Sequence, residues 1–326
     1  MGVLLTIAIP TYRRCKYVVQ NVASLIPQLL AHRDRVRLII SDNHSEDGTY
    51  EALFPYANRY GELISIHEHE ENVGWMNNFF YGIDKAESDF VYLLGDDDIV
   101  SPNFLDIVLP ILDAGGDKLG LLHMNYLMGD VNLTGLSPLY KDLGSNSMIE
   151  TYYDTLSFVK KFKTGPSFIS SVIFRKSCMQ KGRDLNLRPE TFGYSWFLCM
   201  LTGIIGYDLI YYKMPLCVQR LGGFYPAYCT NYIIGMYNVF KYLDAYLPGS
   251  LDFWREEFSF EHDNIALNIS QLINYRDLYR QYENMFIEAL PNKELRHLLH
   301  VALYWKPFWA GKFFRLFRFY RKLSKR

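Results

Sequence analysis

Long hydrophobic runs are missing from this sequence. No apolar stretch among its 326 residues reaches the ~20 residues that a membrane-spanning helix needs, so we expect no such helix. Residues 1–17 contain a short apolar stretch, but neither a preceding basic region nor a small-residue cleavage site, so a first strand is expected there instead of a signal peptide. Internal repeats and low-complexity segments are also absent. These absences favour a globular chain with one large domain, or a medium domain with an appendage.

Cysteine is scarce, and the cysteines lie far apart in the sequence. The number of cysteines is odd and no two of them have the short spacing of a metal-binding pair, so we expect reduced, buried thiols in a cytoplasmic protein. A Gly-rich, Lys/Arg-bearing loop near the N-terminus is also lacking, which argues against a nucleotidyltransferase that holds a triphosphate. The five cysteines are Cys15, Cys178, Cys199, Cys217 and Cys229.

Acidic residues are missing from the C-terminal segment 303–326, called here the tail. It contains eight Lys or Arg and nine aromatic residues, and the net charge of −1 for the whole chain therefore leaves about −9 on residues 1–302. A basic, aromatic segment suits an anionic membrane surface. Two alternatives are binding to single-stranded nucleic acid and a helix that packs its aromatic face on the domain. The acidic body argues against nucleic acid, so a membrane surface is the favoured partner.

Apolar patterns alternate between strand and helix spacing in the first third of the chain. Strands separated by helices of this length indicate right-handed βαβ units and a parallel sheet, hence an α/β fold. Further strands are predicted at 167–176 and, as a pair, within 204–223, and the pattern is helical over 228–300. The alternating elements are strands at 4–10, 36–42, 63–69 and 89–95, and helices at 17–30, 49–60 and 76–86.

Three consecutive aspartates, Asp96, Asp97 and Asp98, follow the apolar segment 90–95. Adjacent carboxylates repel one another unless a positive charge lies between them, and hard divalent cations bind one or two carboxylates together with substrate phosphates. Ligands of open α/β sheets bind at the carboxyl ends of the strands. An alternative is a solvated acidic turn that precedes the next helix. Polar residues also follow the other predicted strands, which favours a binding site over a turn.

Four motifs resemble family-2 glycosyltransferases of the GT-A fold, and among them the abequosyltransferase-like enzymes of O-antigen synthesis. They are TIAIPTYRR (6–14), LIISDNHSEDGT (38–49), ENVGWMNN (71–78) and YLLGDDDIVSP (92–102). The motifs occur in the family's order over about 100 residues. The resemblance implies the GT-A, nucleotide-diphospho-sugar transferase fold with a helical C-terminal region.

The resemblance also implies a donor site. Asp42 and Tyr12 would bind the nucleotide's ribose and base, roles that an acceptor carboxylate and a stacking ring can perform. Within the acidic D-x-D motif, Asp96 would lie near the ribose and Asp98 would bind Mn²⁺ or Mg²⁺, with Asp96 the second metal ligand. The full set of implied donor-binding residues is Pro10, Thr11, Tyr12, Asp42, Asn72, Gly74, Asn78, Asp96, Asp97 and Arg220, the last of these over the diphosphate.

The catalytic base departs from the family pattern. Inverting members carry a Glu-Asp pair just before a Trp, whereas Tyr194 and Ser195 precede Trp196 here. Glu190 is the candidate base that deprotonates the acceptor hydroxyl, although a Glu that caps a helix explains the residue equally well, and Asp184 is a second candidate. Tyr194 and Trp196 are candidate acceptor-side residues, with core packing as their alternative.

The sequence therefore predicts a metal-dependent, inverting glycosyltransferase. It would move a sugar from a nucleotide-sugar donor to an undecaprenyl-linked saccharide during synthesis of bacterial O-antigen, capsule or another surface polysaccharide, from the cytoplasmic face of the plasma membrane. Alternatives are a nucleotide-sugar-binding protein with impaired catalysis and a nucleic-acid-binding protein that acts through the tail. The predicted parts are a catalytic domain at 1–227 (1–105 nucleotide-binding, 106–227 acceptor-side), a helical region at 228–302 and the tail at 303–326.

Overall fold

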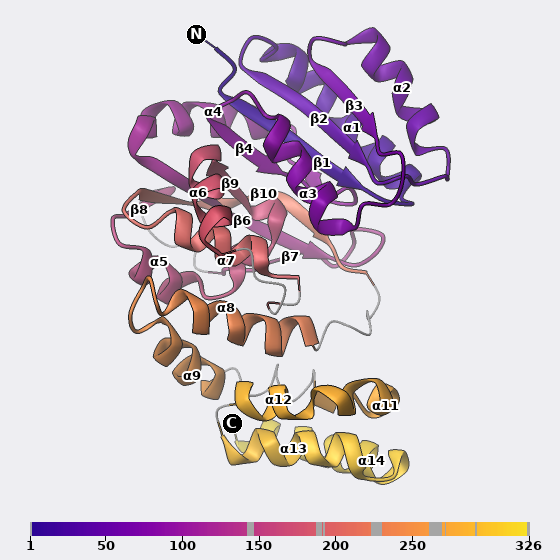
Figure 1. The fold of residues 1–326 in the computed structure, drawn as a ribbon, viewed down its shortest axis with the longest axis vertical. Coiled ribbons are helices and arrows are strands. Elements are labelled where there is room, and N and C mark those ends of the chain that lie inside the picture. Colours follow the sequence, from indigo (N-terminus) through magenta and orange to yellow (C-terminus); the bar gives the residue numbers. More distant parts are fainter. Residues whose placement is uncertain are drawn as a thin grey trace. The chain divides into compact units, whose positions relative to one another are not determined.

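The computed structural model divides the chain into two compact units (Figure 1). The first comprises Met1–Leu185 and Cys199–Gly223, and the second comprises Asn186–Leu198 and Phe224–Arg326, so the division falls within helix α7 (Ser195–Gly203). The domain limits expected from the sequence remain predictions. The structure describes residues 2–141, 147–186, 191, 193–222, 230–260, 269–270, 272–290 and 292–324.

The first unit is built around one mixed sheet. Its main path runs in the order β3-β2-β1-β4-β9-β6-β10-β5, while β7 pairs with β6 and β8 pairs with β10. The strands are β1 (Leu5–Thr11), β2 (Val36–Asp42), β3 (Ile64–Glu68), β4 (Phe90–Leu93), β5 (Ile99–Val100), β6 (Leu119–Gly129), β7 (Ser137–Pro138), β8 (Ile149–Tyr152), β9 (Val172–Arg175) and β10 (Asp208–Arg220).

The first four strands confirm the predicted parallel arrangement. β1 lies between β2 and β4 and is parallel to both, and β3 extends the sheet beyond β2 in the same direction. Because the strands are parallel, their carboxyl ends meet at one edge, where Thr11 is in register with Asp42. The intervening helices also lie where the spacing predicts them, namely α1 (Cys15–Ala31), α2 (Thr49–Arg59) and α3 (Trp75–Lys85).

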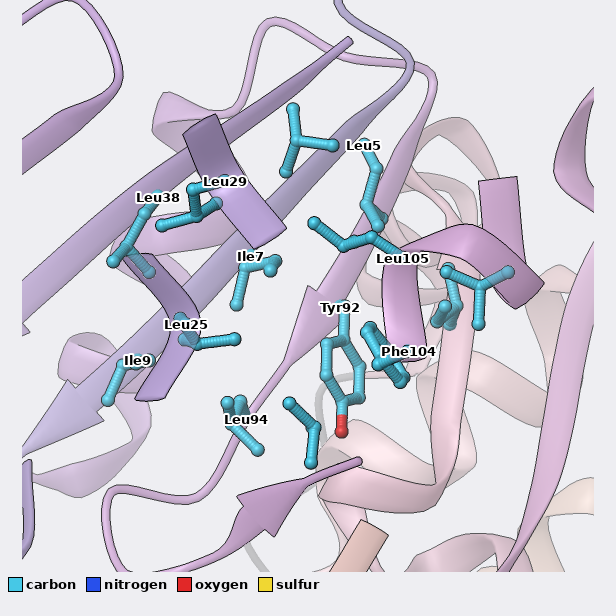
Figure 2. Packing of buried hydrophobic residues seen from close by; sticks show 14 of the residues in the cluster. Leu5, Ile7, Ile9, Leu25, Leu29, Leu38, Tyr92, Leu94, Phe104 and Leu105 are labelled. Atoms are coloured by element: carbon cyan, nitrogen blue, oxygen red, sulfur yellow. The ribbon is translucent and has the colours of Figure 1, made fainter. Parts of the chain in front are cut away.

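Both faces of β1 are buried, by different helices. Leu5, Ile7 and Ile9 belong to the main hydrophobic core together with apolar residues of α1, α2 and α4 (Phe104–Gly115). Figure 2 shows this packing, with Leu25 and Leu29 of α1 beside the strand residues. On the opposite face α3 approaches closely, because a Cβ on its Gly82 would lie 2.5 Å from the Cβ of Ala8. Covered faces explain why these strands are almost continuously apolar.

The second half of the sheet differs from the prediction in two places. Residues 167–176 form a strand only at β9, which is antiparallel to β4 and β6 and follows the short 3-10 helices Gly165–Ser167 and Ile169–Ser171. The strand pair expected within 204–223 is wrong, because this segment forms the single strand β10. Its register against β6 shifts between Tyr212 and Cys217, and this irregular stretch accommodates Pro215, which cannot donate a ladder hydrogen bond.

The second unit is helical over its described residues, as the periodicity predicts. The stacked rings of Phe240 and Trp254, 5.0 Å apart, join α8 to α9, and Asn292 caps α13 by accepting a hydrogen bond from the Leu295 N–H. No helix in the described parts of the chain is long and apolar enough to cross a membrane. The main helices are α8 (Met236–Leu243), α9 (Ser250–Phe260), α11 (Arg276–Tyr279), α12 (Glu283–Ala289), α13 (Lys293–Tyr304) and α14 (Pro307–Ser324).

The remaining helices of the first unit flank the second half of the sheet. The N-terminus of α5 is capped by Asp154, whose carboxylate accepts hydrogen bonds from two backbone N–H groups. The helices are α5 (Thr155–Phe162) and α6 (Lys176–Asn186).

The cysteines Cys178, Cys199 and Cys217 are buried free thiols, as expected, whereas Cys15 is only partly buried and Cys229 lies outside the described residues.

Candidate active site

The carboxyl ends of β1, β2 and β4 form a continuous polar edge. The Leu94 N–H donates to the Ala8 carbonyl over 3.0 Å, which carries the β4 backbone alongside β1 past the last residue of the strand. Asp96 therefore follows next to Thr11, whose hydroxyl donates to Asp96 Oδ2 over 2.9 Å. The same edge contains Asp42 at the end of β2. The parallel topology thus brings together residues that the sequence separates widely.

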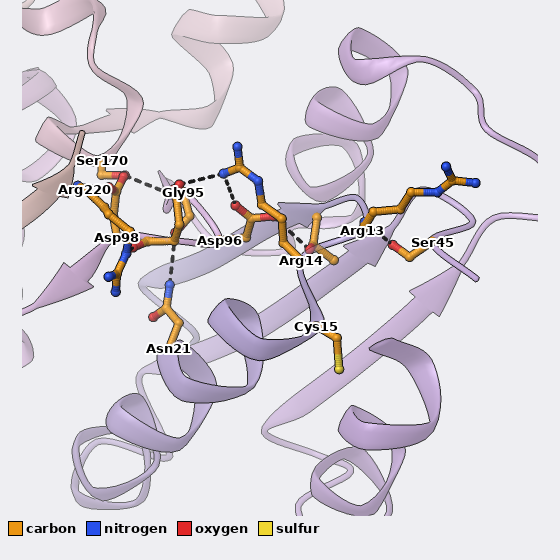
Figure 3. Close-up of polar contacts among 12 residues, drawn as sticks. Arg13, Arg14, Cys15, Asn21, Ser45, Gly95, Asp96, Asp98, Ser170 and Arg220 are labelled. Carbon is orange, nitrogen blue, oxygen red and sulfur yellow. Dashed lines mark hydrogen bonds and ion pairs between the residues drawn. The ribbon is translucent and has the colours of Figure 1, made fainter. Parts of the chain in front are cut away.

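Asp96 and Asp97 share one cation. Arg14, at the start of α1, places Nη1 3.0 Å from Asp96 Oδ1 and 2.6 Å from Asp97 Oδ2 (Figure 3). Asp96 is buried, whereas Asp97 is partly exposed. The guanidinium therefore offsets the repulsion between the adjacent carboxylates of Asp96 and Asp97.

Asp98 is held by uncharged donors. The Ser170 hydroxyl donates to Asp98 Oδ2 over 2.6 Å, and the backbone N–H of Arg220 donates to Oδ1 over 3.1 Å. Gly95 completes the turn, because its N–H donates to the Ser170 hydroxyl and a Cβ on it would overlap Asp98 Oδ2. The side chain of Asn21 in α1 also donates to the Gly95 carbonyl over 3.0 Å. The acidic turn is therefore fixed from three elements of the first unit.

Burial disfavours the ionised form of Asp96 and Asp98, the first and last carboxyl groups of the run. Burial raises the pKa of Asp96 to about 6, although the nearby Arg14 opposes this shift. Burial also raises the pKa of Asp98 to about 7, against the hydrogen bond from Ser170 and with additional repulsion from Asp97 and Asp96. A bound cation would favour the ionised form of such carboxyl groups, and perturbed carboxyl groups of this kind are typical of functional sites.

Arg220 reaches the acidic turn through sheet pairing. The end of β10 runs antiparallel to β5, with Val218 opposite Ile99, so the next residues of β10 lie beside Asp98. The Arg220 Nε–H donates to the Asp97 carbonyl over 2.9 Å. Its guanidinium also lies over the ring of Tyr17, 4.8 Å from the centroid. The side chain predicted to lie over a diphosphate is therefore held at the edge of the acidic turn.

The loops that follow β1 and β2 are strained, and Asp42 is the last residue of β2. Asp42 is buried and accepts a hydrogen bond from the Ser45 hydroxyl, and burial raises its pKa. Arg13, His44 and Glu46 adopt left-handed backbone conformations with φ of 53°, 60° and 55°. Such conformations cost about 1–3 kcal/mol each for residues with a side chain and cluster at functional sites. The ends of β1 and β2 therefore show the strain expected of a binding edge.

Tyr12 and Pro10 occupy different environments at the end of β1. Pro10 lies within the sheet, in register with Ser41 of β2. Tyr12 lies just beyond the strand and is 38% exposed, and the Arg13 guanidinium is 5.2 Å from its ring centroid. An exposed ring at the strand end is available for stacking on a planar ligand. The structure therefore leaves Tyr12 accessible, while Pro10 contributes backbone.

The turn before α3 is tied to β2 by amide side chains. Asn43 Nδ2 donates to Asn72 Oδ1 over 3.0 Å, and Asn43 Oδ1 accepts from the Val73 N–H over 2.9 Å. The Gly74 N–H donates to Asn72 Oδ1 over 2.9 Å, and Gly74 has a φ of 81° that favours glycine. These bonds place the predicted Asn72 and Gly74 beside the Asp42 edge.

Asn78 of α3 is buried and bonded within the protein. Its Oδ1 accepts from the Ser41 hydroxyl over 2.6 Å, and its Nδ2 donates to the Thr11 carbonyl over 3.2 Å. Asn78 therefore joins the ends of β1 and β2. A contact between Asn78 and the donor remains a prediction.

The predicted acceptor-side residues belong to the second unit. Trp196 is only 3% exposed and its ring lies 5.8 Å from that of Phe197, whereas Tyr194 is half-buried. Glu190, the candidate base, lies outside the described residues. Asp184, the second candidate, is exposed near the end of α6. The assignment of these residues to the acceptor or to the base remains a prediction.

The side-chain oxygens available as ligands decide what kind of metal site this edge fits. In the described ranges, no three His, Cys, Asp or Glu side chains converge on one point. Asp96 and Asp98 nevertheless provide buried carboxylate oxygens at one turn. Mg²⁺ and Mn²⁺ are hard cations that accept one or two carboxylates and complete their shell with substrate oxygens. The edge fits a metal of that kind.

Three residues that position the acidic turn were missed from the sequence. Arg14 is part of the TIAIPTYRR motif, Gly95 directly precedes the acidic run, and Ser170 lies in the segment 167–176. The Gly95 position could have been found, because a glycine between a buried strand and a carboxylate cluster often permits a close approach. Ser170 carries no sequence signal, since its contact with Asp98 spans 72 residues.

Comparison with protein families agrees with this geometry. The family model for glycosyl transferase family 2 matches residues 6–180, which run from within β1 to beyond β9 and include the acidic turn. Abequosyltransferase RfbV of Salmonella typhimurium is 32% identical over 114 residues, which are 35% of this chain and 34% of that protein. The match thus spans about a third of the curated relative.

Solved structures extend the similarity to the whole fold. S. aureus TarS 1–349 superposes with a TM-score of 0.58 at 17% identity, over 97% of this chain and 91% of that one, and has also been solved with UDP. Mannosyltransferase PcManGT from Pyrobaculum calidifontis, in complex with GDP-Man and Mn²⁺, gives a TM-score of 0.54 at 13% identity, over 94% and 88% of the two chains. The superpositions show that this chain has a GT-A fold with a helical C-terminal region. Since the family model covers more than half of the sequence, the chain belongs to glycosyl transferase family 2.

Proposed function

We propose that this enzyme transfers a sugar from a nucleoside-diphosphate sugar to a hydroxyl group of a saccharide, with Mg²⁺ or Mn²⁺ bound at the acidic turn. The hydrogen bond from Thr11 to Asp96 is the observation that carries the proposal. It joins the strand ends with Tyr12 and Asp42 to the carboxylates, so one ligand can extend across both. A nucleoside diphosphate has the matching order of groups: a planar base, a ribose and two phosphates.

Each part of the donor has a suitable partner at this edge. The exposed ring of Tyr12 can stack on the base, and the Asp42 carboxylate can accept from a base N–H or a ribose hydroxyl. The Arg220 guanidinium, held by Tyr17 and by the Asp97 carbonyl, offers donors to phosphate oxygens. The ligands in the similar solved structures, UDP, UDP-GlcNAc and GDP-Man, support this donor class.

Asp98 is the proposed main metal ligand and Asp96 the second. When bound, the metal would supply Lewis-acid stabilisation of the negative charge on the leaving nucleoside diphosphate. The chain's own contribution is to fix the carboxylate in advance: Ser170 and the Arg220 N–H each hold one oxygen of Asp98. A fixed carboxylate avoids reorganisation during the reaction, which is the physical basis of electrostatic catalysis.

The acceptor hydroxyl must lose a proton as it attacks the anomeric carbon. Glu190 is the proposed general base, and attack from the face opposite the leaving group would invert the anomeric configuration. The anomeric coupling constant of the product, measured by proton NMR, tests inversion directly. Retention of configuration would reject this part of the proposal.

The tail is proposed to hold the enzyme on the cytoplasmic face of the plasma membrane. In α14, Ala310 and Phe314 are buried, whereas Phe308 and Trp309 are 66% and 54% exposed. Lys312, which is also exposed, lies with its Nζ 5.6 Å from the Trp309 ring centroid. Rings beside cations suit the headgroup region of anionic lipids. A lipid-linked saccharide, such as an undecaprenyl-linked one, is the acceptor class that this location favours.

The donor site is tested by thermal unfolding with UDP, GDP, CDP and dTDP, each with and without Mn²⁺. A nucleotide that binds the native state raises the unfolding midpoint by mass action. We expect one nucleotide to do so only with Mn²⁺, and Asp98→Ala to abolish the shift. Asp106→Ala, which removes an exposed carboxylate of α4, is the matched control and should retain it. The absence of any shift in the wild type would reject the proposed donor site.

Membrane attachment is tested by co-sedimentation with vesicles of phosphatidylcholine alone or mixed with phosphatidylglycerol. We expect binding to the anionic vesicles, and clearly weaker binding in the double variant Phe308→Ser, Trp309→Ser. Tyr153→Ser removes an aromatic residue that is 78% exposed in the first unit, and this control should bind like the wild type. Binding to a single-stranded oligonucleotide without binding to vesicles would reject the membrane proposal in favour of nucleic acid.

A further inference from the structure

Two consecutive arginines at the start of α1 point in opposite directions. The left-handed backbone of Arg13, with a φ of 53°, turns the chain between them. Figure 3 shows the Arg14 side chain directed toward Asp96 and the Arg13 side chain directed away from it. Arg13 instead pairs with Glu46 over 3.4 Å. Neighbours of identical chemistry thus have different surroundings, and only one of them contacts the acidic turn.

Arg14 occupies carboxylate oxygens that a metal would need. Its Nη1 bridges Asp96 Oδ1 and Asp97 Oδ2, while the other oxygen of Asp96 is taken by the Thr11 hydroxyl. A divalent cation that approaches Asp96 from Oδ1 therefore meets a guanidinium at the same place. Two cations cannot share one small group of oxygens without strong mutual repulsion.

The side chain of Arg14 is held less firmly than that of Arg220. It is 48% exposed, and its guanidinium pairs with the partly exposed Asp97 and with the buried Asp96. The pair with Asp97 contributes little by itself, whereas the buried Asp96 carboxylate needs a cation, so Arg14 can leave when a metal ion takes its place. The Arg220 guanidinium, in contrast, stacks on Tyr17 and bonds to backbone carbonyl groups. Arg14 is therefore the cation that can leave.

We propose that Arg14 is the resident counter-cation of the acidic turn, that a divalent metal displaces it, and that the released guanidinium then binds the diphosphate of the donor. This inference rests on the proposed function. Without metal, Arg14 keeps Asp96 and Asp97 from repelling each other. With metal and donor, the same side chain, still anchored at the start of α1, meets phosphate oxygens that its planar fork matches well. Arg14 thus positions the carboxylates in the metal-free protein and contacts the diphosphate of the nucleotide sugar once the metal is bound.

The two parts of the proposal predict opposite changes in one variant. Arg14→Gln removes a competitor of the metal, so Mn²⁺ alone should bind about fivefold tighter. The same change removes hydrogen bonds from the guanidinium to the phosphates, so the nucleoside diphosphate should bind on the order of tenfold more weakly with Mn²⁺ present. A residue that only maintains the local structure would weaken both.

The experiment compares Arg14→Gln with Arg13→Gln, the adjacent change that leaves the acidic turn untouched. Free Mn²⁺ is measured by its electron paramagnetic resonance signal, and binding of the nucleotide that stabilises the wild type is measured by calorimetry, with its parent nucleoside as the control that lacks phosphate. We expect Arg13→Gln to bind free Mn²⁺ as the wild type does. Because Arg13 lies over the Tyr12 ring, any change in its nucleotide affinity should be shared equally by the nucleoside. Arg14→Gln should bind the nucleoside as the wild type does.

A second variant, Arg14→Lys, retains the charge but loses the planar fork. It should bind Mn²⁺ with nearly the wild-type affinity and the nucleoside diphosphate more weakly, and it keeps the test decisive if Arg14→Gln fails to fold. If Arg14→Gln binds Mn²⁺ and the nucleotide as Arg13→Gln does, or binds both more weakly, the inference is overturned while the proposed function stands. If the wild type binds neither, both are overturned.

Discussion

The acidic turn and the tail concentrate charge of opposite sign in opposite ways. Asp96 and Asp98 are buried, and each carboxylate oxygen has a specific partner from another part of the first unit. In α14 of the second unit, Lys312 is exposed beside the exposed ring of Trp309. A buried charge is costly unless its partners are fixed, whereas an exposed charge contributes little alone and acts by summation.

This difference predicts how each region responds to substitution. The acidic turn should fail when one atom is removed or added, because its geometry depends on contacts across the fold. The tail should lose binding in small steps, because each ring or cation contributes independently to a lipid surface. Four substitution tests, in order of decreasing effect, examine the contrast.

The largest effect is expected from Asp98→Ala on sugar transfer. Removing the proposed metal ligand takes away stabilisation of the leaving diphosphate, and we expect the transfer rate to fall by about 10²–10³. The measurement is release of nucleoside diphosphate with an acceptor present. Asp106→Ala should remain within about twofold of the wild type. Equal activity of the two variants would show that the acidic turn does not take part in transfer.

The second effect is a pH dependence of stability caused by Asp98. Its folded-state pKa is raised to about 7, above the unfolded value, so the folded protein binds the proton more tightly. The free energy of unfolding of the metal-free protein should therefore fall as pH rises from about 4 to about 7. Asp98→Asn removes this titration and should be more stable than the wild type at pH 8 by a few kcal/mol. Urea unfolding at several pH values measures it, and a pH-independent difference would contradict it.

The third test compares the same substitution in both regions. In Gly95→Ala the new methyl group overlaps Asp98 Oδ2, so we expect a loss of about 1–3 kcal/mol in stability and weaker metal-dependent nucleotide binding. Gly311→Ala in α14 meets no atom within 4 Å and should instead gain about 0.5–1 kcal/mol, because alanine favours the helix. Urea melts of both variants provide the comparison, and a gain in both would contradict the tight packing of the acidic turn.

The smallest effect is expected from Lys312→Gln in the tail. One basic residue near an anionic membrane is worth about 1 kcal/mol, so vesicle binding should weaken about fivefold without being lost. Nucleotide binding should not change. Raising the salt concentration should reduce the difference between the variant and the wild type, because screening weakens exposed charges. A complete loss of vesicle binding would show that the tail acts through one specific contact.

The parallel half of the sheet was predictable because its signals are local. Each strand from β1 to β4 is an apolar run that ends in polar residues, and each intervening helix has its own periodicity. β10 was not predictable as one strand, since Pro215 interrupts the pattern and only the pairing with β6 carries the strand past it. Tertiary pairing overrides local propensity in this way where a register shift absorbs an unsuitable residue.

The candidate site shows the same limit. Asp42 and the acidic run could be singled out from the sequence, because clustered carboxylates at strand ends are unusual without a ligand. Their partners could not, since Arg14 and Ser170 contact them across 82 and 72 residues. Which of two adjacent arginines pairs with the acidic turn depends on one left-handed backbone angle at Arg13.

The alternation of strands and helices, the strand ends and the family can be read from the amino-acid sequence, because they depend on periodicity and on short motifs. Which group occupies each carboxylate oxygen depends on how the chain folds. Hydrogen bonds and burial depend on distances of a few ångströms between segments that are remote along the chain. The chemistry of Asp98 therefore follows from its surroundings as much as from the residue itself.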